Sequence, residues 1–433
     1  MIVMGGIIGS GIFINPYVVA RQVSTPFLIL AAWGLGGLIA LAGAFVYAEL
    51  ATRMPEVGGQ YAYLREAFHP SVAFLYGWVL LLVIQTGGMA AVAVTFAAYF
   101  HEVTGIAVPP GPVAVAVLAI LAIVNCLGVR TGSRVQSALM ILKIVAIAAL
   151  IACGGWLLLR PGSPAPIAAP PAPPAGLWAL LRSIATAMVP VLFAYGGWQT
   201  SNFVAEEIRE PRRNLPRALV GGVLGVIVLY LGVNYVCVAV LGPGGLAATP
   251  TPASAVMQRA FGTAGSRWIA IGIAISALGF LSQSILTAPR VYYAMARDGL
   301  FFRSVGWLDP RHGVPSVAIL LQAAMAIVIA LSGRYDQILS YVVSMDFLFY
   351  GLTATSLFVF RRRESAVSRR EHRPALARVP GHPVTTALFV IASGLVVVNT
   401  IDKYPRDTAI GFGILLAGIP VYFFWRRRAR AAA

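Results

Sequence analysis

Charged residues are scarce in this sequence, and lysine is almost absent. Charged side chains make up 11% of the 433 residues, and lysine occurs only as Lys143 and Lys403. The five histidines all fall in expected loops or at the ends of hydrophobic segments, without the spacing of a zinc site. An enzyme embedded in a membrane would need clustered histidine or carboxylate side chains there. We therefore expect no enzyme, no metal site and no cofactor.

Cysteine is also rare, and Cys126, Cys153 and Cys237 all fall in hydrophobic segments. None of them fits an extracellular disulfide framework. The pattern of a cleavable signal peptide is missing as well, because the first hydrophobic segment leads directly into a loop and a second segment. Only eight residues precede Gly9 in that first segment, so we expect that an N-terminal extension is missing.

Hydrophobic residues are what the chain has in abundance. They make up 59% of it, and the mean hydropathy is +0.82. Apolar runs that can cross a hydrocarbon core of ~30 Å recur along the whole length. We predict an all-α polytopic membrane protein with about twelve transmembrane helices. Their expected ranges are 1–20, 27–48, 72–100, 112–127, 135–159, 177–204, 219–241, 268–294, 317–331, 339–360, 385–399 and 409–425.

The formal net charge of +17 comes from basic residues concentrated in alternate loops. If the N-terminus is cytoplasmic, the inner loops and the C-terminal tail hold 23 basic residues and the outer side holds eight. The positive-inside rule then places both termini in the cytoplasm, in a multi-pass protein of the cytoplasmic membrane. We assign the basic runs to topology and to contact with anionic lipids, and not to nucleic acid.

Two of the expected helices contain glycine-rich breaks, with Gly9, Ser10 and Gly11 in the first and Gly196 and Gly197 in the sixth. In a bilayer, unwound backbone persists only where it is buried in protein or lines a cavity. The breaks are five segments apart, as expected if two five-helix repeats of opposite orientation meet at a substrate site. The alternative is that these glycines only allow close helix packing.

The two breaks predict groups of opposite polarity. Near Ser10, Gly11 and Ile12 a helix begins inside the membrane, where free N–H groups and a partial positive charge favour a carboxylate. At the second break, freed carbonyls of residues 193–195 favour an ammonium group. A ligand that carries both groups a few ångströms apart is an α-amino acid. Glycine is required because a side chain would block the close approach of the backbone.

Four segments resemble the amino acid-polyamine-organocation (APC) superfamily, and within it the L-type amino-acid transporter family. They read Gly-Ile-Ile-Gly-Ser-Gly-Ile-Phe at 6–13, Phe-Ala-Tyr-Gly-Gly-Trp at 193–198, Glu-Glu-Ile-Arg-Glu-Pro-Arg-Arg-Asn-Leu-Pro at 206–216 and Gly-Ile-Pro-Val-Tyr-Phe-Phe at 418–424. The resemblance extends over nearly the whole chain. It implies the five-plus-five inverted-repeat, LeuT-like fold, with helices 1 and 6 broken, two peripheral helices and alternating access to a central site.

The same resemblance implies roles for single residues. The backbone of the first break binds the substrate carboxylate, the backbone of residues 193–195 binds the amine, and Phe193 acts as an aromatic gate. Tyr230 matches a family tyrosine that helps to close the site, with Asn234 one turn further on; the alternative for both is hydrogen bonding between helices. The expected substrate-binding residues are Ile8, Ser10, Gly11, Ile12, Phe193, Ala194, Tyr195, Gly196 and Asp346.

Lys143 lies within the fifth expected segment, and a charge at that depth is costly enough to indicate function. In relatives of this family, a lysine at the matching place lies where sodium-coupled cousins bind sodium. Its ammonium group can meet the helix-1 carbonyls of residues 5–8. Lys143 is therefore expected to substitute for sodium or to couple transport to protons; the alternative is snorkelling to the cytoplasmic interface.

Asp346 departs from the family, in which the matching place in helix 10 is often polar or neutral. It could select a cationic substrate, couple to protons or pair with Lys143, or it could face a polar cavity without touching the ligand. Gln85 and residues 282–284 are interpreted as polar contacts between helices, outside the site. Glu206 and Glu207 are expected to end the sixth helix and to hold the inner loop.

Residues 1–360 are expected to form the transport core, with repeats at 1–159 and 177–360. An arginine-rich cytoplasmic connection at 361–383 and peripheral helices with a basic tail at 384–433 follow. Animal members of the L-type family pair with a glycoprotein through a cysteine between helices 3 and 4. The loop 101–111 has no cysteine, so we expect no disulfide-linked heavy subunit.

Together these features predict a secondary transporter of neutral L-amino acids, by sodium-independent exchange or proton-coupled uptake. Its expected partners are the amino-acid substrate and the lipid bilayer. The alternatives are a cationic amino-acid or polyamine permease and, more distantly, an amino-acid-binding membrane receptor that does not transport.

Overall fold

The computed structural model describes residues 1–106, 108–160, 176–332, 335–367 and 377–432. All regular secondary structure in these residues is helical. Two short 3-10 helices (η2, η3) and one π-helical turn (η1) interrupt the α-helices. In chain order the elements are α1 (Ile2–Ile7), α2 (Gly11–Ala20), α3 (Pro26–Arg53), α4 (Gln60–Ala67), α5 (Pro70–Val79), η1 (Leu80–Ile84), α6 (Gln85–Thr104), α7 (Pro110–Cys126), α8 (Val129–Leu159), α9 (Leu177–Tyr195), η2 (Trp198–Glu207), α10 (Pro211–Ala248), α11 (Pro252–Thr287), α12 (Pro289–Arg297), η3 (Arg303–Gly306), α13 (Ser316–Ser332), α14 (Tyr335–Val367), α15 (Val384–Lys403) and α16 (Pro405–Ala432).

The chain is a polytopic membrane protein by the length and composition of its helices. Among the described residues, nine helical stretches are long and apolar enough to cross a bilayer. The other three expected segments correspond to the shorter apolar helices α2, α7 and α13. The helix α14 continues to Val367, so it extends into the connection that was expected to begin at residue 361. Part of that connection, residues 368–376, lies outside the described residues.

Proline marks many of the helix starts. Pro26 opens α3, where the Thr25 side chain accepts a hydrogen bond from the Leu28 N–H at 3.2 Å. Pro70 opens α5 after a similar cap by His69. Proline fits the first helical turn because its missing N–H would have no partner there, and its fixed φ already suits the helix. The local sequence thus determines where these helices begin.

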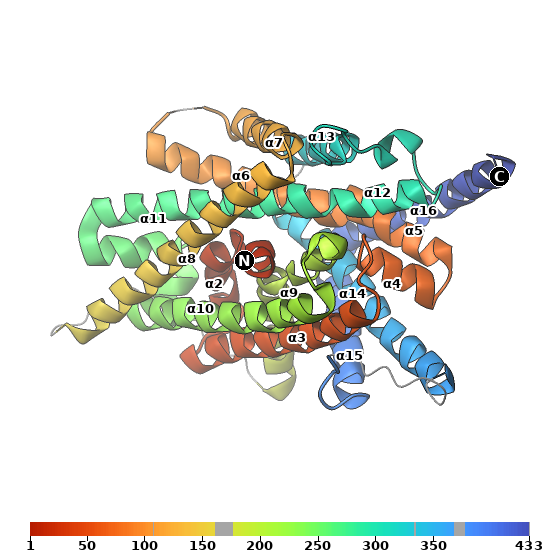
Figure 1. Cartoon of the computed structure of the whole chain (residues 1–433). Helices are drawn as coiled ribbons and strands as arrows, with labels where there is room; N and C mark the ends of the chain where they lie inside the picture. The colour runs from red at the N-terminus through yellow and green to blue at the C-terminus, as the bar shows by residue number, and fades with distance from the viewer. Residues whose placement is uncertain (107, 161–175, 333–334, 368–376, 433) are drawn as a thin grey trace.

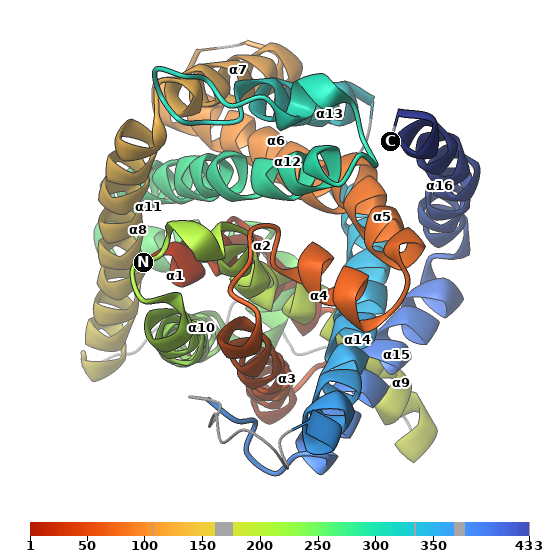
Figure 2. The same cartoon turned by 45° about the vertical axis from the view of Figure 1, so that its right-hand side comes forward.

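The first helix pair lies inside the bundle. In Figures 1 and 2, α1 and α2 occupy the centre, and α3, α10, α11 and α14 surround them. The helices α10 and α3 pack along each other, as do α11 with α6 and α8, and α14 with α15. The helices α7 and α13 pack together at one margin, and α15 and α16 lie at another (Figure 2).

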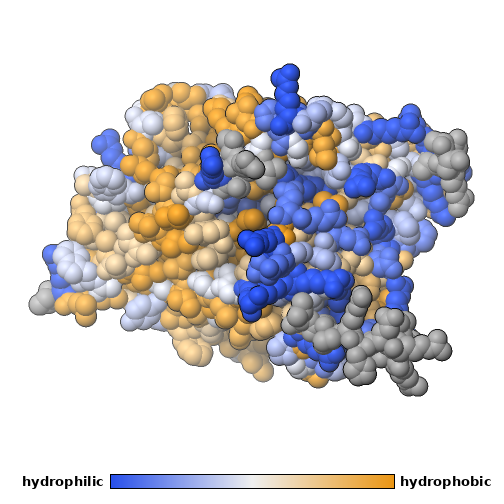
Figure 3. Space-filling view, in the orientation of Figure 1, coloured by the Kyte–Doolittle hydropathy of each residue, from blue (hydrophilic) through white to orange (hydrophobic). Residues whose placement is uncertain are grey.

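The surface separates by polarity. In the view of Figure 3, hydrophobic residues cover the broad area over α6, α8, α10 and α11. Hydrophilic residues gather at the right-hand end, around α4 and the C-terminal part of α16. A wide apolar belt is what a hydrocarbon environment requires of the lipid-facing surface.

Both predicted helix breaks are present. Residues 8–10 separate α1 from α2, and Gly196 and Gly197 separate α9 from η2. The structure adds an irregularity that the hydrophobic pattern did not reveal. In η1 the Gln85 N–H binds the Leu80 carbonyl, which is the i to i−5 bond of a π turn.

Candidate functional site

The two breaks lie directly against each other. A Cβ atom added to Gly197, whose φ is +100°, would lie 2.0 Å from the Gly6 carbonyl oxygen. One added to Gly11 would lie 3.2 Å from the Ala194 Cα atom. Real Cβ atoms cannot approach a backbone as closely as the first of these distances. Glycine here therefore serves the expected purpose, because it lets two backbones touch, and at Gly197 it also allows a backbone conformation that other residues rarely adopt.

A cavity lies at this junction. Its walls come from α1, α2, α6, α9, η2, α11 and α14 and from the end of η1. The breaks, the cavity and the polar groups described below therefore form one candidate site.

Most of the residues predicted to bind substrate line this cavity. They are Ser10, Gly11, Phe193, Ala194, Gly196 and Asp346. Ile8, Ile12 and Tyr195 do not line it, although their position in sequence had suggested that they would. The side chains of Ile8 and Ile12 are fully buried in the surrounding core, and the ring of Tyr195 packs on Trp33 and Tyr230.

At the first break, α2 begins with Gly11 and its first N–H groups have no preceding turn to bind. Ser10 occupies the N-cap position of α2, but its side chain does not cap the helix. The Ser10 hydroxyl is fully buried and makes no hydrogen bond within the described residues. The Phe13 N–H already binds the Ser10 carbonyl at 3.1 Å. The N–H groups of Gly11 and Ile12 and the Ser10 hydroxyl are thus the donors that this break can offer to an anion.

The carbonyls of the second break are less free than the sequence suggested. The Phe193 carbonyl accepts a hydrogen bond from the Gly196 N–H at 3.2 Å, and the Ala194 carbonyl lies 3.1 Å from the Tyr230 hydroxyl. A carbonyl oxygen has two lone pairs, so each can still accept a second donor. An ammonium group at this end would share these oxygens with protein donors.

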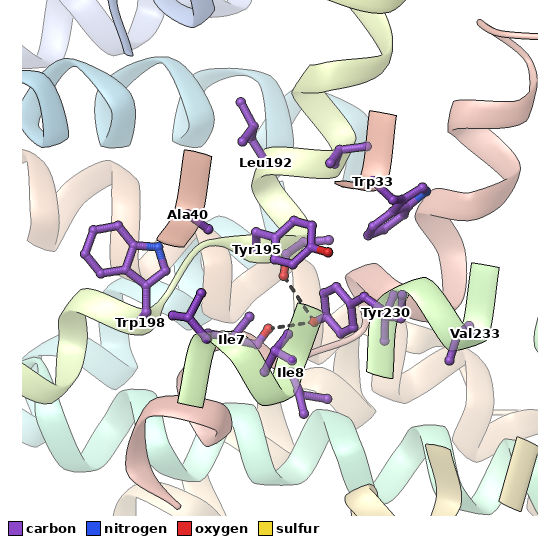
Figure 4. Packing of buried hydrophobic residues seen from close by; sticks show 14 of the residues in the cluster. Ile7, Ile8, Trp33, Ala40, Leu192, Tyr195, Trp198, Tyr230 and Val233 are labelled. Carbon is purple, nitrogen blue, oxygen red and sulfur yellow. Dashed lines mark hydrogen bonds between the residues drawn. The ribbon is translucent and has the colours of Figure 1, made fainter. Parts of the chain in front are cut away.

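Tyr230 connects the two breaks. Figure 4 shows its hydroxyl between two carbonyl oxygens, those of Ile7 at 3.2 Å and Ala194 at 3.1 Å. Its ring meets Trp33 edge-on at 5.7 Å between centroids. Asn234, one turn further along α10, donates a hydrogen bond from its side chain to the Tyr230 carbonyl and does not line the cavity. Movement of α1 away from α9 would therefore break at least one of the two contacts of the Tyr230 hydroxyl.

Lys143 is fully buried, which contradicts the snorkelling alternative. Its ammonium group donates hydrogen bonds to the Gly5 carbonyl at 3.1 Å and to the Ile8 carbonyl at 2.6 Å. These are the last carbonyls of α1, which have no partner further along the helix. A fixed cation from α8 therefore holds the end of α1 beside the cavity.

Asp346 reaches the cavity from α14. Its carboxylate accepts a hydrogen bond from the Tyr350 hydroxyl at 2.9 Å and lies beside Gly196, 3.9 Å from a Cβ atom built there. It makes no ion pair with Lys143 in the described part of the chain, so that alternative is wrong for this conformation. Asp346 brings a carboxyl group to the wall of the cavity near the second break.

Three polar residues that were interpreted as contacts between helices also line the cavity. They are Gln85, Gln283 and Ser284, whereas Ser282 does not line it. Gln283 also donates a hydrogen bond to the Thr200 hydroxyl at 2.8 Å, so it contacts η2 as well. Their only signal in the sequence is that they are polar within apolar segments. That signal could not show which way each side chain faces.

The acidic residues after the sixth segment hold the neighbouring loop as expected. Glu206 accepts a hydrogen bond from the Val57 N–H at 3.1 Å. Glu207 forms a paired contact with the Arg290 guanidinium, with N–O distances of 2.8 Å and 3.2 Å. These contacts tie η2 to the loop after α3 and to α12, on one side of the cavity.

A comparison with known protein families identifies the family of this chain. Residues 1–425 match the family model described as amino acid permease. The chain belongs to the amino acid permease family. The permease is therefore a multi-pass membrane transporter of amino acids and not an enzyme, and the resemblance to the APC superfamily is confirmed.

Curated relatives agree with this assignment along nearly the full length of the permease. It is 30% identical to the serine/threonine exchanger SteT of Bacillus subtilis (strain 168), and the alignment covers 99% of this chain and 95% of the relative. It is 29% identical to the large neutral amino acids transporter small subunit 2 of Homo sapiens, with 99% and 80% covered. It is 31% identical to the b(0,+)-type amino acid transporter 1 of Mus musculus, with 91% and 81% covered.

Proposed function

We propose that this permease moves neutral L-amino acids across the cytoplasmic membrane by alternating access. The observation that carries the proposal is the pairing of the breaks around one cavity, with N–H donors at the start of α2 and carbonyl acceptors at the end of α9. Only a ligand with a carboxylate and an amine close together satisfies both ends. In this proposal the backbones of residues 9–11 and of Phe193, Ala194 and Gly196 hold the substrate, and Phe193 and Tyr230 gate it.

The proposal includes a specific architecture. Twelve membrane helices form a ten-helix core at 1–360, with inverted repeats at 1–159 and 177–360 as in the LeuT-like fold. The helices α15 and α16 are peripheral to it. The position of the breaks supports this reading, because they interrupt the first and the sixth apolar segments, as two repeats of opposite orientation would require. Both termini then lie in the cytoplasm.

Transport is proposed to be independent of sodium and to proceed by exchange or with proton coupling. The support is Lys143, whose ammonium group occupies a position against the α1 carbonyls that a monovalent cation could otherwise fill. Exchange is favoured by the similarity to a protein named as a serine/threonine exchanger. The loop 101–111 has no cysteine, so we propose that the permease works without a disulfide-linked heavy subunit.

Uptake of radiolabelled amino acids into proteoliposomes tests this function. We expect uptake of neutral L-amino acids that is stimulated by unlabelled substrate inside the vesicles and is unchanged when choline replaces sodium. Accumulation that requires sodium would contradict the role of Lys143. Binding without any flux would favour a receptor.

A cationic amino-acid or polyamine permease is the second candidate, and Asp346 is the observation that favours it. Its carboxylate lies at the cavity wall, where a second ammonium group of a substrate would find a partner. Competition of lysine, ornithine and putrescine against a neutral substrate distinguishes the candidates. Inhibition by these cations that disappears in Asp346→Asn would support the second one.

A further inference from the structure

We propose that Gln85, Gln283 and Ser284 form a polar subsite for the substrate side chain, and that it selects amino acids carrying a hydroxyl or carboxamide group. This inference rests on the proposed function and narrows its substrate class. The three residues come from neighbouring helices, Gln85 from α6 and the other two from α11, and they line the same cavity as the two breaks.

Unpaired polar atoms in this wall are the first argument. Gln283 and Ser284 are fully buried, and neither the Gln283 Oε1 atom nor the Ser284 hydroxyl has a hydrogen-bond partner in the described residues. A buried polar atom without a partner is costly, and native structures pair the great majority of them. Because both residues line the cavity, a ligand in the cavity can supply the missing partners.

The π turn is the second argument, because it determines where Gln85 lies. The Gln85 N–H donates the i to i−5 hydrogen bond of this turn to the Leu80 carbonyl, and the Thr86 hydroxyl donates to the Leu81 carbonyl at 2.6 Å. A π turn inserts one residue into the helix and so rotates everything after it relative to what precedes it. Such turns are frequent at functional sites. As a result, Ile84, Gln85 and Gly88 face the cavity.

The chemistry of the wall indicates the class of side chain. The Gln283 Oε1 atom needs a hydrogen-bond donor, while the Ser284 hydroxyl and the Gln85 amide can both donate and accept. Hydroxyl and carboxamide groups also do both, so serine, threonine, asparagine and glutamine can satisfy this wall. An aliphatic side chain would leave it unpaired. A carboxylate side chain would meet Asp346 in the same cavity.

Isosteric pairs of substrates provide the test. Threonine and valine have nearly the same shape, as do asparagine and leucine, so each pair differs mainly in hydrogen bonding. We expect the unmodified permease to prefer threonine over valine and asparagine over leucine on the order of tenfold, measured as the ratio of initial exchange rates in proteoliposomes. Ser284→Ala and Gln85→Leu should bring both ratios close to one while uptake of valine and leucine persists.

Ser282→Ala is the matched control. The Ser282 hydroxyl is also buried and without a partner in the described residues, but Ser282 does not line the cavity. It should leave both ratios unchanged. Persistent valine binding shows that each variant is folded.

Three results would overturn the subsite. The first is that the unmodified permease does not distinguish the isosteric partners. The second is that Ser284→Ala and Gln85→Leu together leave the ratios as they were, as expected if these polar atoms only bind water. The third is that lysine is exchanged faster than all four polar substrates. Absence of flux for every amino acid would contradict the proposed transport instead. Equilibrium binding of threonine, valine, asparagine and leucine to the purified permease would then still decide the subsite.

Discussion

Lys143 shows how much one residue can contribute to this site. A charged side chain without water needs partners, and the ends of a broken helix provide carbonyls that need donors. The Gly5 and Ile8 carbonyls and the Lys143 ammonium group satisfy each other at 3.1 Å and 2.6 Å. The same contact fixes α1 relative to α8, so removing it should affect both the stability and the transport cycle.

Lys143→Met keeps the length of the side chain and removes its charge. We expect a loss of exchange activity to about a tenth or less, because hydrogen bonds to a charged group are among the strongest and here two carbonyls lose their donor. Exchange in proteoliposomes measures the loss, and Lys403→Met is the control because Lys403 is exposed. Full activity of Lys143→Met would contradict the role of the cation.

Tyr230 makes a second prediction at this scale. Tyr230→Phe retains the ring that packs on Trp33 and Tyr195 but removes the hydroxyl between the two breaks. We expect a small loss of stability, about 1 kcal/mol, and a larger relative loss of exchange rate. Thermal unfolding in detergent and exchange assays separate the two effects. Tyr235→Phe changes an exposed residue of the same helix and should alter neither.

Among the helices, the two pairs that flank the breaks, α1 with α2 and α9 with η2, form the centre of the site. Their glycines are required where two backbones meet, which a substitution can test. Gly197→Ala would force a Cβ atom onto the Gly6 carbonyl, at a φ of +100° that an L-residue rarely adopts. We expect this variant to lose transport and to be unstable in detergent, as judged by size-exclusion chromatography.

Gly221→Ala is the matched control for this prediction. A Cβ atom at Gly221 has nothing within 4 Å, and the residue lies in the exposed face of α10. Alanine has the higher helix propensity, so we expect unchanged or slightly increased stability. If Gly197→Ala behaved like Gly221→Ala, the close contact between the breaks would not be needed for function.

The elements also show where reasoning from sequence succeeds. The positions of the breaks and the polarity of the first one were predictable, because glycine clusters within apolar segments and the rules of helix termini are local properties. The orientation of the Gln85, Gln283 and Ser284 side chains toward the cavity was not predictable. It depends on the π turn before Gln85 and on how α6 and α11 pack, and neither leaves a pattern in the hydrophobic periodicity.

Across the whole molecule, Glu49 connects helices that are distant in the sequence. Its side chain is fully buried, and its carboxylate pairs with the Arg53 and Arg361 guanidinium groups at 2.7 Å and 2.6 Å. The Val379 N–H also donates to it at 2.7 Å. One carboxylate thus joins α3, the end of α14 and the segment that leads into α15.

Glu49→Gln should therefore destabilise the permease as a whole. Breaking a buried ion pair leaves an uncompensated charge and typically costs about 3–5 kcal/mol. We expect a clear fall in the unfolding temperature in detergent. Glu66→Gln is the control, because Glu66 and Arg363 form an exposed pair at 3.5 Å and such pairs contribute about 0–1 kcal/mol. Equal effects of the two variants would show that Glu49 has no special structural importance.

The sequence by itself determined that this chain is a membrane protein and that its first and sixth apolar segments are broken. It also determined that Lys143 places a costly charged group within an apolar segment. These conclusions follow from composition, segment length and the cost of polar groups in lipid, all of which act locally along the chain. Only the tertiary structure decided which side chains meet in the cavity. It brought Tyr230 to the Ala194 carbonyl and placed Gln283 and Ser284 beside the breaks, because such contacts depend on how helices distant in sequence rotate and pack against one another.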